Sequence, residues 1–173
     1  LAGEMENRGQ IYAHDASKIR LAPIYDRLRR SGARNVQVCA PDPGGIDGLV
    51  GRMDLVFVDA PCSGSGVWRR RPDSKWRITP NALSARRAEQ DQVLGAARDF
   101  VRDGGHMLYA TCSVFPCENE ERVRAFLSEN PDFAPVDLSL RWEGIFGADA
   151  SRPRFTEEGF ATLSPARTDT DGF

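Results

Sequence analysis

Short apolar runs alternate with segments of helical spacing along most of this chain, from residue 10 to residue 130. The apolar runs lie at residues 10–14, 36–39, 55–58 and 107–110. The segments with helical spacing lie at residues 17–30, 79–101 and 118–129, and shorter strands and loops are expected after residue 133. This alternation predicts an α/β fold with a mostly parallel sheet and helices on both faces.

Capping residues mark the ends of two of the predicted helices. Ser17 is a suitable cap for the first helix and Gly32 a suitable end, although Pro23 lies inside it. Thr79-Pro80 is a typical helix start, with Thr79 as cap and proline at the first helical position. Gly104-Gly105 is expected to close this second helix.

Composition sets limits on the kind of protein. A length of 173 residues fits one domain, so residues 1–173 are expected to form a single domain. The formal charge of −2 does not indicate nucleic-acid binding by overall charge, so any RNA contact must rest on a local patch or on a further segment. No apolar run is long enough for a membrane span. We expect a cytoplasmic protein, because the four cysteines lack the spacing of a disulfide scaffold. We also expect a monomer.

Three predicted strands end on polar residues, at Asp15, at Asp59 and at Thr111-Cys112. In open α/β sheets the ligand crevice lies beyond the carboxyl ends of the strands. These residues are therefore expected to converge on one crevice.

Two cysteine motifs follow two of these strands. Residues 59–66 read Asp-Ala-Pro-Cys-Ser-Gly-Ser-Gly, and residues 111–120 read Thr-Cys-Ser-Val-Phe-Pro-Cys-Glu-Asn-Glu. A cysteine at a strand-to-helix turn lies near a helix N-terminus, where the dipole and free N–H groups favour the thiolate. Cys112 is therefore a candidate nucleophile.

With these motifs the chain resembles the Sun (NOL/NOP/Sun) family of RNA cytosine-C5 methyltransferases, whose bacterial members act on small-subunit ribosomal RNA. The family pattern Asp-Ala-Pro-Cys-Ser-Gly matches residues 59–64, and Thr-Cys-Ser followed by Pro and Glu-Asn-Glu matches residues 111–120. The stretch at 68–76 also resembles a family segment, and the similarity covers most of residues 8–173. The resemblance implies a Rossmann-like methyltransferase domain, S-adenosylmethionine as cofactor, and RNA, with ribosomal RNA as the expected substrate.

The resemblance also implies a role for five residues. Cys112 would bond to C6 of the cytosine, and Cys62 would assist release of the product. Asp59 would contact both cofactor and cytosine. Asp15 would hold the ribose hydroxyls of S-adenosylmethionine, and Asp42 stands roughly where the family has an acidic residue on the adenine side.

The start of the chain departs from the family pattern. The family carries a glycine-rich loop ending in Gly-Gly-Lys one strand before Asp15, and nothing in residues 1–9 matches it. Because the chain begins with Leu1 and ends at Phe173 without an obvious terminator, we expect both ends to be truncated. The loop would seat the methionine end of the cofactor, so cofactor binding is expected to be weakened.

Simpler interpretations stand beside these roles. Cys112 and Cys62 could be ordinary core or loop cysteines, Asp15 could only cap a helix, and Asp42 could be a turn residue. Zinc binding is the alternative use of the cysteines, but no C-x-x-C pair is present, and no metal is expected.

The densest basic cluster lies between Trp68 and Trp76. It comprises Arg69, Arg70, Arg71, Lys75 and Arg77, offset by Asp73. A solvated loop is the simple interpretation, and phosphate contact with base stacking on the tryptophans is the functional one. Arg86 and Arg87 are expected to lie on a helix surface.

Two other functions remain open from the sequence. One is a non-catalytic RNA-binding module that no longer binds cofactor. The other is a cysteine-nucleophile enzyme of another class, such as a hydrolase using Cys112. The absence of a histidine in either motif disfavours this second alternative.

Overall fold

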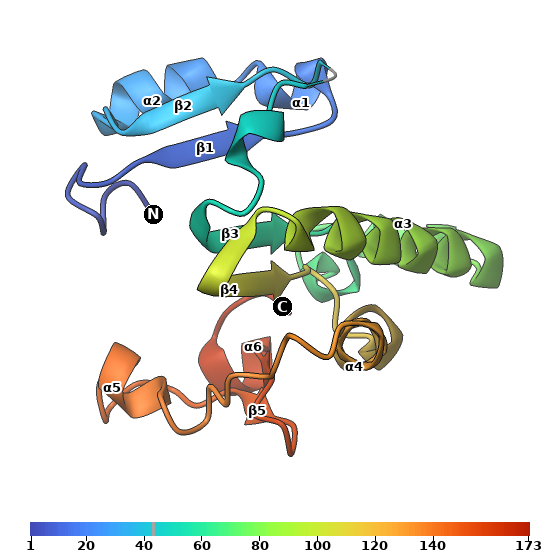
Figure 1. Ribbon diagram of the computed structural model, residues 1–173. Helices are drawn as coiled ribbons and strands as arrows, with labels where there is room; N and C mark the ends of the chain where they lie inside the picture. The colour runs from blue at the N-terminus through green and yellow to red at the C-terminus, as the bar shows by residue number, and fades with distance from the viewer. Residues whose placement is uncertain (43) are drawn as a thin grey trace. The chain divides into compact units, whose positions relative to one another are not determined.

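The computed structural model describes residues 1–42 and 44–173 of the chain. These residues form two compact units, Leu1–Arg52 and Met53–Phe173, and each is described by itself. Figure 1 shows the elements of both units along the chain. No helix among the described residues combines the length and apolar character needed to cross a membrane.

The first unit is built on a parallel pair of strands. Strand β1 (Ile11–His14) pairs with β2 (Val36–Cys39) in a register that places His14 opposite Cys39. Helices α1 (Lys18–Leu21) and α2 (Ile24–Ser31) connect the two strands, and a short 3₁₀ turn, η1 (Asp47–Leu49), follows β2. Strand β2 coincides with its predicted range, and β1 begins one residue later than predicted. The predicted loop at residues 42–45 includes Pro43, which lies outside the described residues.

The prediction of one continuous helix over residues 17–30 is wrong. The structure has two helices separated at Ala22 and Pro23, because proline lacks the backbone N–H that a continuous helix needs. The predicted caps lie at the outer ends. Ser17 accepts a hydrogen bond from the Arg20 backbone N–H at 3.4 Å, and Gly32 ends α2 with φ of 66°.

The second unit is also built on a parallel pair. Strand β3 (Met53–Asp59) pairs with β4 (Val101–Ala110), with Asp59 opposite Ala110. The other elements of this unit up to residue 129 are three 3₁₀ turns and two helices: η2 (Ser65–Val67), η3 (Pro72–Arg77), α3 (Pro80–Arg98), η4 (Pro116–Glu118) and α4 (Glu120–Glu129). Thr79 caps α3 as predicted, since its hydroxyl accepts from the Ala82 N–H at 3.1 Å.

The predicted end of the second helix at Gly104-Gly105 is wrong. Helix α3 ends at Arg98, and both glycines lie inside β4. They allow an irregularity in pairing with β3, because Gly104 has φ of 69° and a side chain on Gly105 would meet the Met53 carbonyl.

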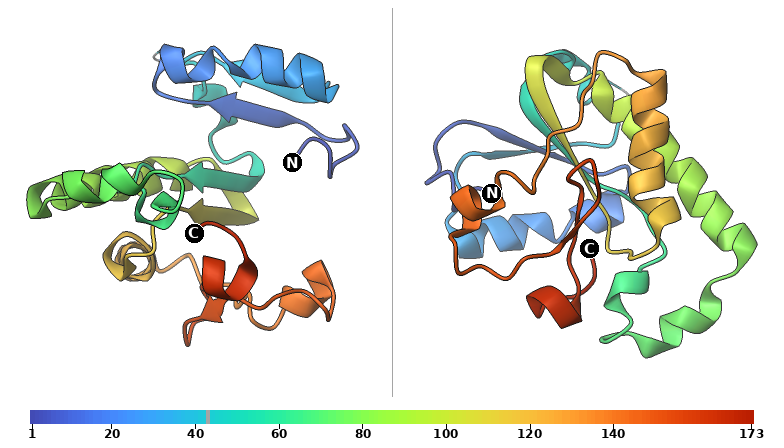
Figure 2. Two further views of the ribbon diagram at one scale, coloured as in Figure 1. Left: turned by 180° about the vertical axis from the view of Figure 1, so that it is seen from behind. Right: turned by 90° about the horizontal axis from the view of Figure 1, so that it is seen from below.

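Helix α3 supplies the core of the second unit. Ala97 packs with Val58 and Ala60 in a buried cluster, and Leu94 is also buried. Helix α4 lies beside α3 in both views of Figure 2. On the opposite side of the strand pair, Leu55 and Phe57 are exposed.

The residues after 133 include helical turns besides the predicted short strands and loops. They form α5 (Trp142–Phe146), the antiparallel pair β5 (Arg154–Phe155) and β6 (Ala161–Thr162), and α6 (Pro165–Thr168).

Candidate functional site

The cysteine motifs meet at the carboxyl ends of β3 and β4. Asp59 is the last residue of β3, and its register partner Ala110 directly precedes Thr111 and Cys112. Asp59 is exposed, whereas Thr111 is buried. The predicted convergence of these two strand ends is therefore present within this unit.

The sulfur atoms of Cys62 and Cys112 lie 3.2 Å apart although 50 residues separate them in the sequence. Both cysteines are half-buried and free of disulfides. Burial, and secondarily the hydrogen bond with Cys112, raises the pKa of the Cys62 thiol from its ordinary 9.0 to about 12. Cys62 is therefore a neutral thiol at physiological pH, in contact with a second sulfur.

We expect alkylation of Cys62 by iodoacetamide to increase about tenfold per pH unit beyond pH 9, because only the thiolate reacts and its pKa is about 12. In urea the alkylation rate of Cys62 should instead level off above pH 9, because the unfolded thiol has its ordinary pKa of 9.0. Peptide mass spectrometry of the folded and denatured chain measures both rates. The folded state disfavours the thiolate, so the stability from this group is present below pH 9 and lost as pH rises towards 12. If the alkylation rate of Cys62 in the folded chain reached a plateau near pH 9, the raised pKa of this buried thiol would be contradicted.

The helix expected after the second cysteine motif begins two residues later than predicted. The sequence indicated a helix from residue 118, whereas α4 begins at Glu120 and the 3₁₀ turn η4 precedes it. Loop residues and this turn separate Cys112 from α4, so the helix dipole gives less support to a thiolate than the sequence indicated. The local environment of Cys112 is instead set by Cys62 and by the loop around them.

Serine hydroxyls connect the two cysteine loops. Ser65 and Ser113 share a hydrogen bond at 2.9 Å, and the Val114 N–H donates to the Ser65 hydroxyl at 2.9 Å. The Gly66 N–H donates to the Cys112 carbonyl at 3.0 Å. Sequence reasoning gave these serines no role. Their only signal was their place inside the motifs.

The C-terminal residues pack against the first cysteine loop through two glycines. Gly172 donates its N–H to the Gly66 carbonyl at 2.9 Å, and a side chain on Gly66 would collide with the Gly172 backbone. The close approach therefore requires glycine at this position.

Gly66→Ala should lower the free energy of unfolding by about 1–3 kcal/mol, since backbone atoms of Gly172 must move to admit the methyl group. Gly95→Ala is the matched control, because nothing lies within 4 Å of its added carbon and it sits inside α3, where alanine adds up to ~1 kcal/mol. Urea denaturation measures both values. Equal stability of the two variants would contradict the tight packing of Gly66.

A cavity of about 230 Å³ opens beside Cys62. Its wall comprises Cys62, Ser63, Ser74, Arg77, Ile78, Ala82, Leu83 and Arg86. Arg86 was expected only on a helix surface, but it lines this cavity, and the Nε atom of Arg87 is buried without a hydrogen-bond partner in the described structure. The wall of the cavity thus combines a cysteine, apolar side chains and the guanidinium groups of Arg77 and Arg86.

Part of the basic cluster is held by acidic residues. Arg69 and Arg70 both pair with Asp171, at 3.5 and 2.5 Å, and Arg77 pairs with Asp73 at 2.5 Å.

The two tryptophans of this stretch have different environments. Trp68 packs edge-on against Phe115 with ring centroids 5.9 Å apart. Trp76 is 79% exposed, and the Lys75 ammonium lies 4.6 Å from its ring centroid. Trp76 is therefore the tryptophan that can stack on a base.

Asp15 and Asp42 follow the parallel strands of the first unit. Asp15 accepts at Oδ1 from the Ser17 N–H at 2.7 Å and from Arg20 Nε at 3.0 Å, so it holds the turn that precedes α1. Asp42 pairs with Lys18 at 3.0 Å, and its carbonyl accepts from the Gly45 N–H at 3.0 Å. The turn interpretation of Asp42 thus describes a real contact, whereas α1 is capped by Ser17 and Asp15 supports the turn before it. Within the described residues, these side-chain contacts of Asp15 and Asp42 use Oδ1 alone.

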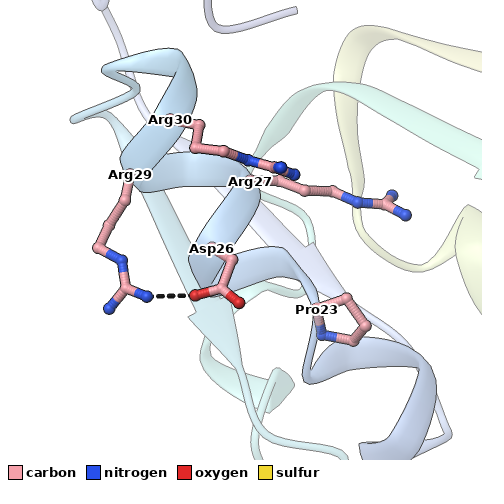
Figure 3. Close-up of a pocket in the computed structure, with 5 residues that line it drawn as sticks. All are labelled: Pro23, Asp26, Arg27, Arg29 and Arg30. Carbon is pink, nitrogen blue, oxygen red and sulfur yellow. Dashed lines mark hydrogen bonds and ion pairs between the residues drawn. The ribbon is translucent and has the colours of Figure 1, made fainter.

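A second cavity, of about 460 Å³, lies on the arginine-rich helix α2. It is lined by Pro23, Asp26, Arg27, Arg29 and Arg30. Figure 3 shows Arg29 paired with Asp26, while Arg27 and Arg30 extend to another side of the helix. Among the residues that the structure describes, no three His, Cys, Asp or Glu side chains are grouped to hold a metal ion.

The chain is similar in sequence to ribosomal RNA methyltransferases. A family model described as 16S rRNA methyltransferase RsmB/F matches residues 1–173. Ribosomal RNA small subunit methyltransferase F of Cronobacter sakazakii (strain ATCC BAA-894) is 36% identical over 176 residues, which cover 100% of this chain and 35% of that protein. A probable ribosomal RNA small subunit methyltransferase B of Bacillus subtilis (strain 168) is also 36% identical, over 100% of this chain and 38% of that protein. The chain therefore spans little more than a third of these relatives.

Solved structures share the fold. The crystal structure of PH0851 aligns with a TM-score of 0.81 at 31% identity, over 99% of this chain and 37% of that one. NSun6 from Pyrococcus horikoshii with SFG aligns with a TM-score of 0.75 at 24% identity, over 99% of this chain and 41% of that one, and shows the fold alone. The predicted α/β, Rossmann-like class is confirmed by these similarities and by the parallel strand pairs.

Proposed function

The chain belongs to the RsmB/F family of 16S rRNA methyltransferases, and on that basis we propose that it transfers a methyl group from S-adenosylmethionine to C5 of a cytosine in ribosomal RNA. The observation that carries the proposal is the 3.2 Å approach of the Cys62 and Cys112 sulfur atoms beyond the ends of β3 and β4. Two thiols in contact suit a reaction in which one sulfur bonds to the base and the other moves a proton.

Cys112 is the proposed nucleophile. C5 of cytosine is a poor nucleophile in the aromatic ring, and addition of a thiolate at C6 makes C5 enamine-like. C5 can then take the methyl group that S-adenosylmethionine supplies. The assignment follows the Thr-Cys-Ser motif at residues 111–113, and Cys62, whose pKa burial raises to about 12, is the thiol of the pair that stays protonated.

Cys62 is the proposed proton relay for release. After methyl transfer, C5 carries both the methyl group and its original proton. When that C–H electron pair re-forms the C5–C6 double bond, the bond from C6 to Cys112 breaks and Cys112 leaves as a thiolate. Cys62 can give its thiol proton to Cys112 and take the proton from C5, so Cys62 ends the cycle protonated. Cys112 then loses the proton it gained to solvent and is again a thiolate for the next attack.

The carboxylates at the strand ends have proposed binding roles. Asp59 is exposed directly after the last buried position of β3, where its side chain can contact the cytosine and the cofactor. Asp15 and Asp42 would bind the cofactor, Asp15 at the ribose hydroxyls. These carboxylates fit that role, because each uses Oδ1 in its own contacts and a second oxygen remains to accept a hydroxyl hydrogen bond.

RNA binding is proposed around the cavity beside Cys62. Arg77 and Arg86 line it together with apolar side chains, which suits a flipped base with its phosphates. Of the basic cluster, Arg71 and Lys75 are exposed and carry no ion pair among the described residues, and Trp76 is available for stacking. Arg69 and Arg70 are assigned instead to holding Asp171.

The hydrolase alternative is disfavoured because neither cysteine motif contains a histidine. Within the described second unit, His106 lies in β4 opposite Leu55, before the strand end that carries Cys112.

The proposal is tested by incubating the chain with methyl-labelled S-adenosylmethionine and small-subunit ribosomal RNA. Label should appear in RNA as 5-methylcytosine, and sequencing after bisulfite treatment should find a protected cytosine. Label in another base or on a ribose would contradict the reaction assigned here.

A further inference from the structure

The carboxylate of Glu118 is fully buried, with 0% of the residue exposed. It belongs to the turn η4, after the second cysteine motif. A buried charged group is costly unless hydrogen bonds compensate for lost water, so its partners indicate what the residue is kept for.

Each of the two side-chain oxygens of Glu118 accepts two hydrogen bonds. Oε1 accepts from the Ser63 backbone N–H at 2.8 Å and from Gln90 Nε2 at 3.1 Å. Oε2 accepts from the hydroxyls of Ser63 and Ser113, at 2.5 and 2.6 Å. No lysine or arginine pairs with it within the described residues, so neutral donors alone hold this carboxylate.

These donors flank the two reacting cysteines. Ser63 directly follows Cys62, and Ser113 directly follows Cys112. Gln90, which is also fully buried, donates at 2.8 Å to the carbonyl of Pro61, the residue before Cys62. Glu118 therefore ties together two loops whose sulfur atoms have to meet, and Gln90 anchors the first loop to α3.

We propose that Glu118 is a positioning residue, which fixes the distance between the Cys62 and Cys112 sulfur atoms for the methyl transfer proposed above. The expected effect on methylation rests on the proposed function, whereas the approach of the two sulfur atoms can be measured whether or not the chain methylates RNA. Loss of the acceptor Oε2 would leave one serine hydroxyl of each loop without its partner, and loss of Oε1 would release the first loop and Gln90. A shift of about 1 Å at the sulfur atoms can cost ~100-fold in rate.

Glu118→Gln keeps the size of the side chain and replaces one acceptor oxygen by an N–H₂ group. Glu121→Gln is the matched control, because Glu121 is exposed on α4 and undergoes the same chemical change. Gln90→Met is a second test variant, which removes only the donor to Glu118 and Pro61 and keeps the helix.

The first readout is oxidation of the two thiols by diamide. Two thiols lose two protons and two electrons, an S–S bond forms, and diamide is reduced to its hydrazine. Mass spectrometry then follows the linked Cys62 and Cys112 peptides. We expect linkage to slow at least ~10-fold in Glu118→Gln, less in Gln90→Met, and not in Glu121→Gln.

The second readout is steady-state methylation. We expect kcat to fall ~100-fold in Glu118→Gln with KM for RNA nearly unchanged, since binding groups are untouched. A residue that only stabilises the fold would lower the melting temperature without changing linkage rate or kcat well below that temperature.

Wild-type linkage and kcat in folded Glu118→Gln would overturn the proposal. Should Glu118→Gln not fold, Gln90→Met decides by the same two readouts. If the wild-type chain does not methylate RNA, the proposed function fails, whereas the linkage rates still support or overturn the positioning role of Glu118.

Discussion

Cys112→Ala is expected to abolish methyl transfer, with a loss of at least ~10⁴-fold in kcat while the chain stays folded. Without a sulfur at this position nothing adds to C6, so C5 keeps its low nucleophilicity. A methylation assay with labelled cofactor measures the loss, and circular dichroism checks the fold.

Cys117→Ala is the control for the loss of a thiol, because Cys117 lies in the turn η4 and has no proposed part in the reaction. Its activity should stay close to wild type. Methylation by Cys112→Ala at a rate near that of the control would remove Cys112 from the mechanism.

Cys62→Ala is expected to trap the enzyme on its product. Cys112 can still attack, but the neutral thiol that lay 3.2 Å from its sulfur is gone, so the proton relay for release is missing. Multiple-turnover methylation should fall by ~10²–10⁴-fold, the usual contribution of a positioned acid or base. A protein–RNA complex that survives denaturation should accumulate on a gel.

The double variant Cys62→Ala/Cys112→Ala should show no such complex, because the covalent bond requires Cys112. Unimpaired turnover by Cys62→Ala with no stalled complex would contradict the release role of Cys62.

The strands were predictable because their signals are local. The apolar runs of β1, β2 and β3 are bounded by polar or turn residues, and the structure reproduces the first two within their predicted ranges. The exact course of β4 was not predictable, since Gly104-Gly105 reads as a helix end from the sequence. Its place in a strand depends on pairing with β3, a contact distant in the sequence.

The meeting of the two cysteine motifs was predictable, but the interactions that hold them together were not. The sequence predicted that the strand ends at Asp59 and at Thr111-Cys112 converge, and β3 and β4 do end side by side. Gln90 lies in the middle of α3 without any motif, and only the folded chain brings it to the carboxylate of Glu118. The ion pairs of Asp171 with the basic loop likewise join residues about a hundred positions apart.

Covalent trapping with RNA that carries 5-fluorocytidine tests the central claim most directly, because fluorine at C5 cannot leave as a proton does. The chain is mixed with S-adenosylmethionine and this RNA, binding of the cofactor is verified by calorimetry, and the products are separated on a denaturing gel. We predict a shifted band that requires the cofactor and disappears in Cys112→Ala. A chain that binds cofactor and RNA yet forms no shifted band would contradict a covalent cytosine-C5 mechanism.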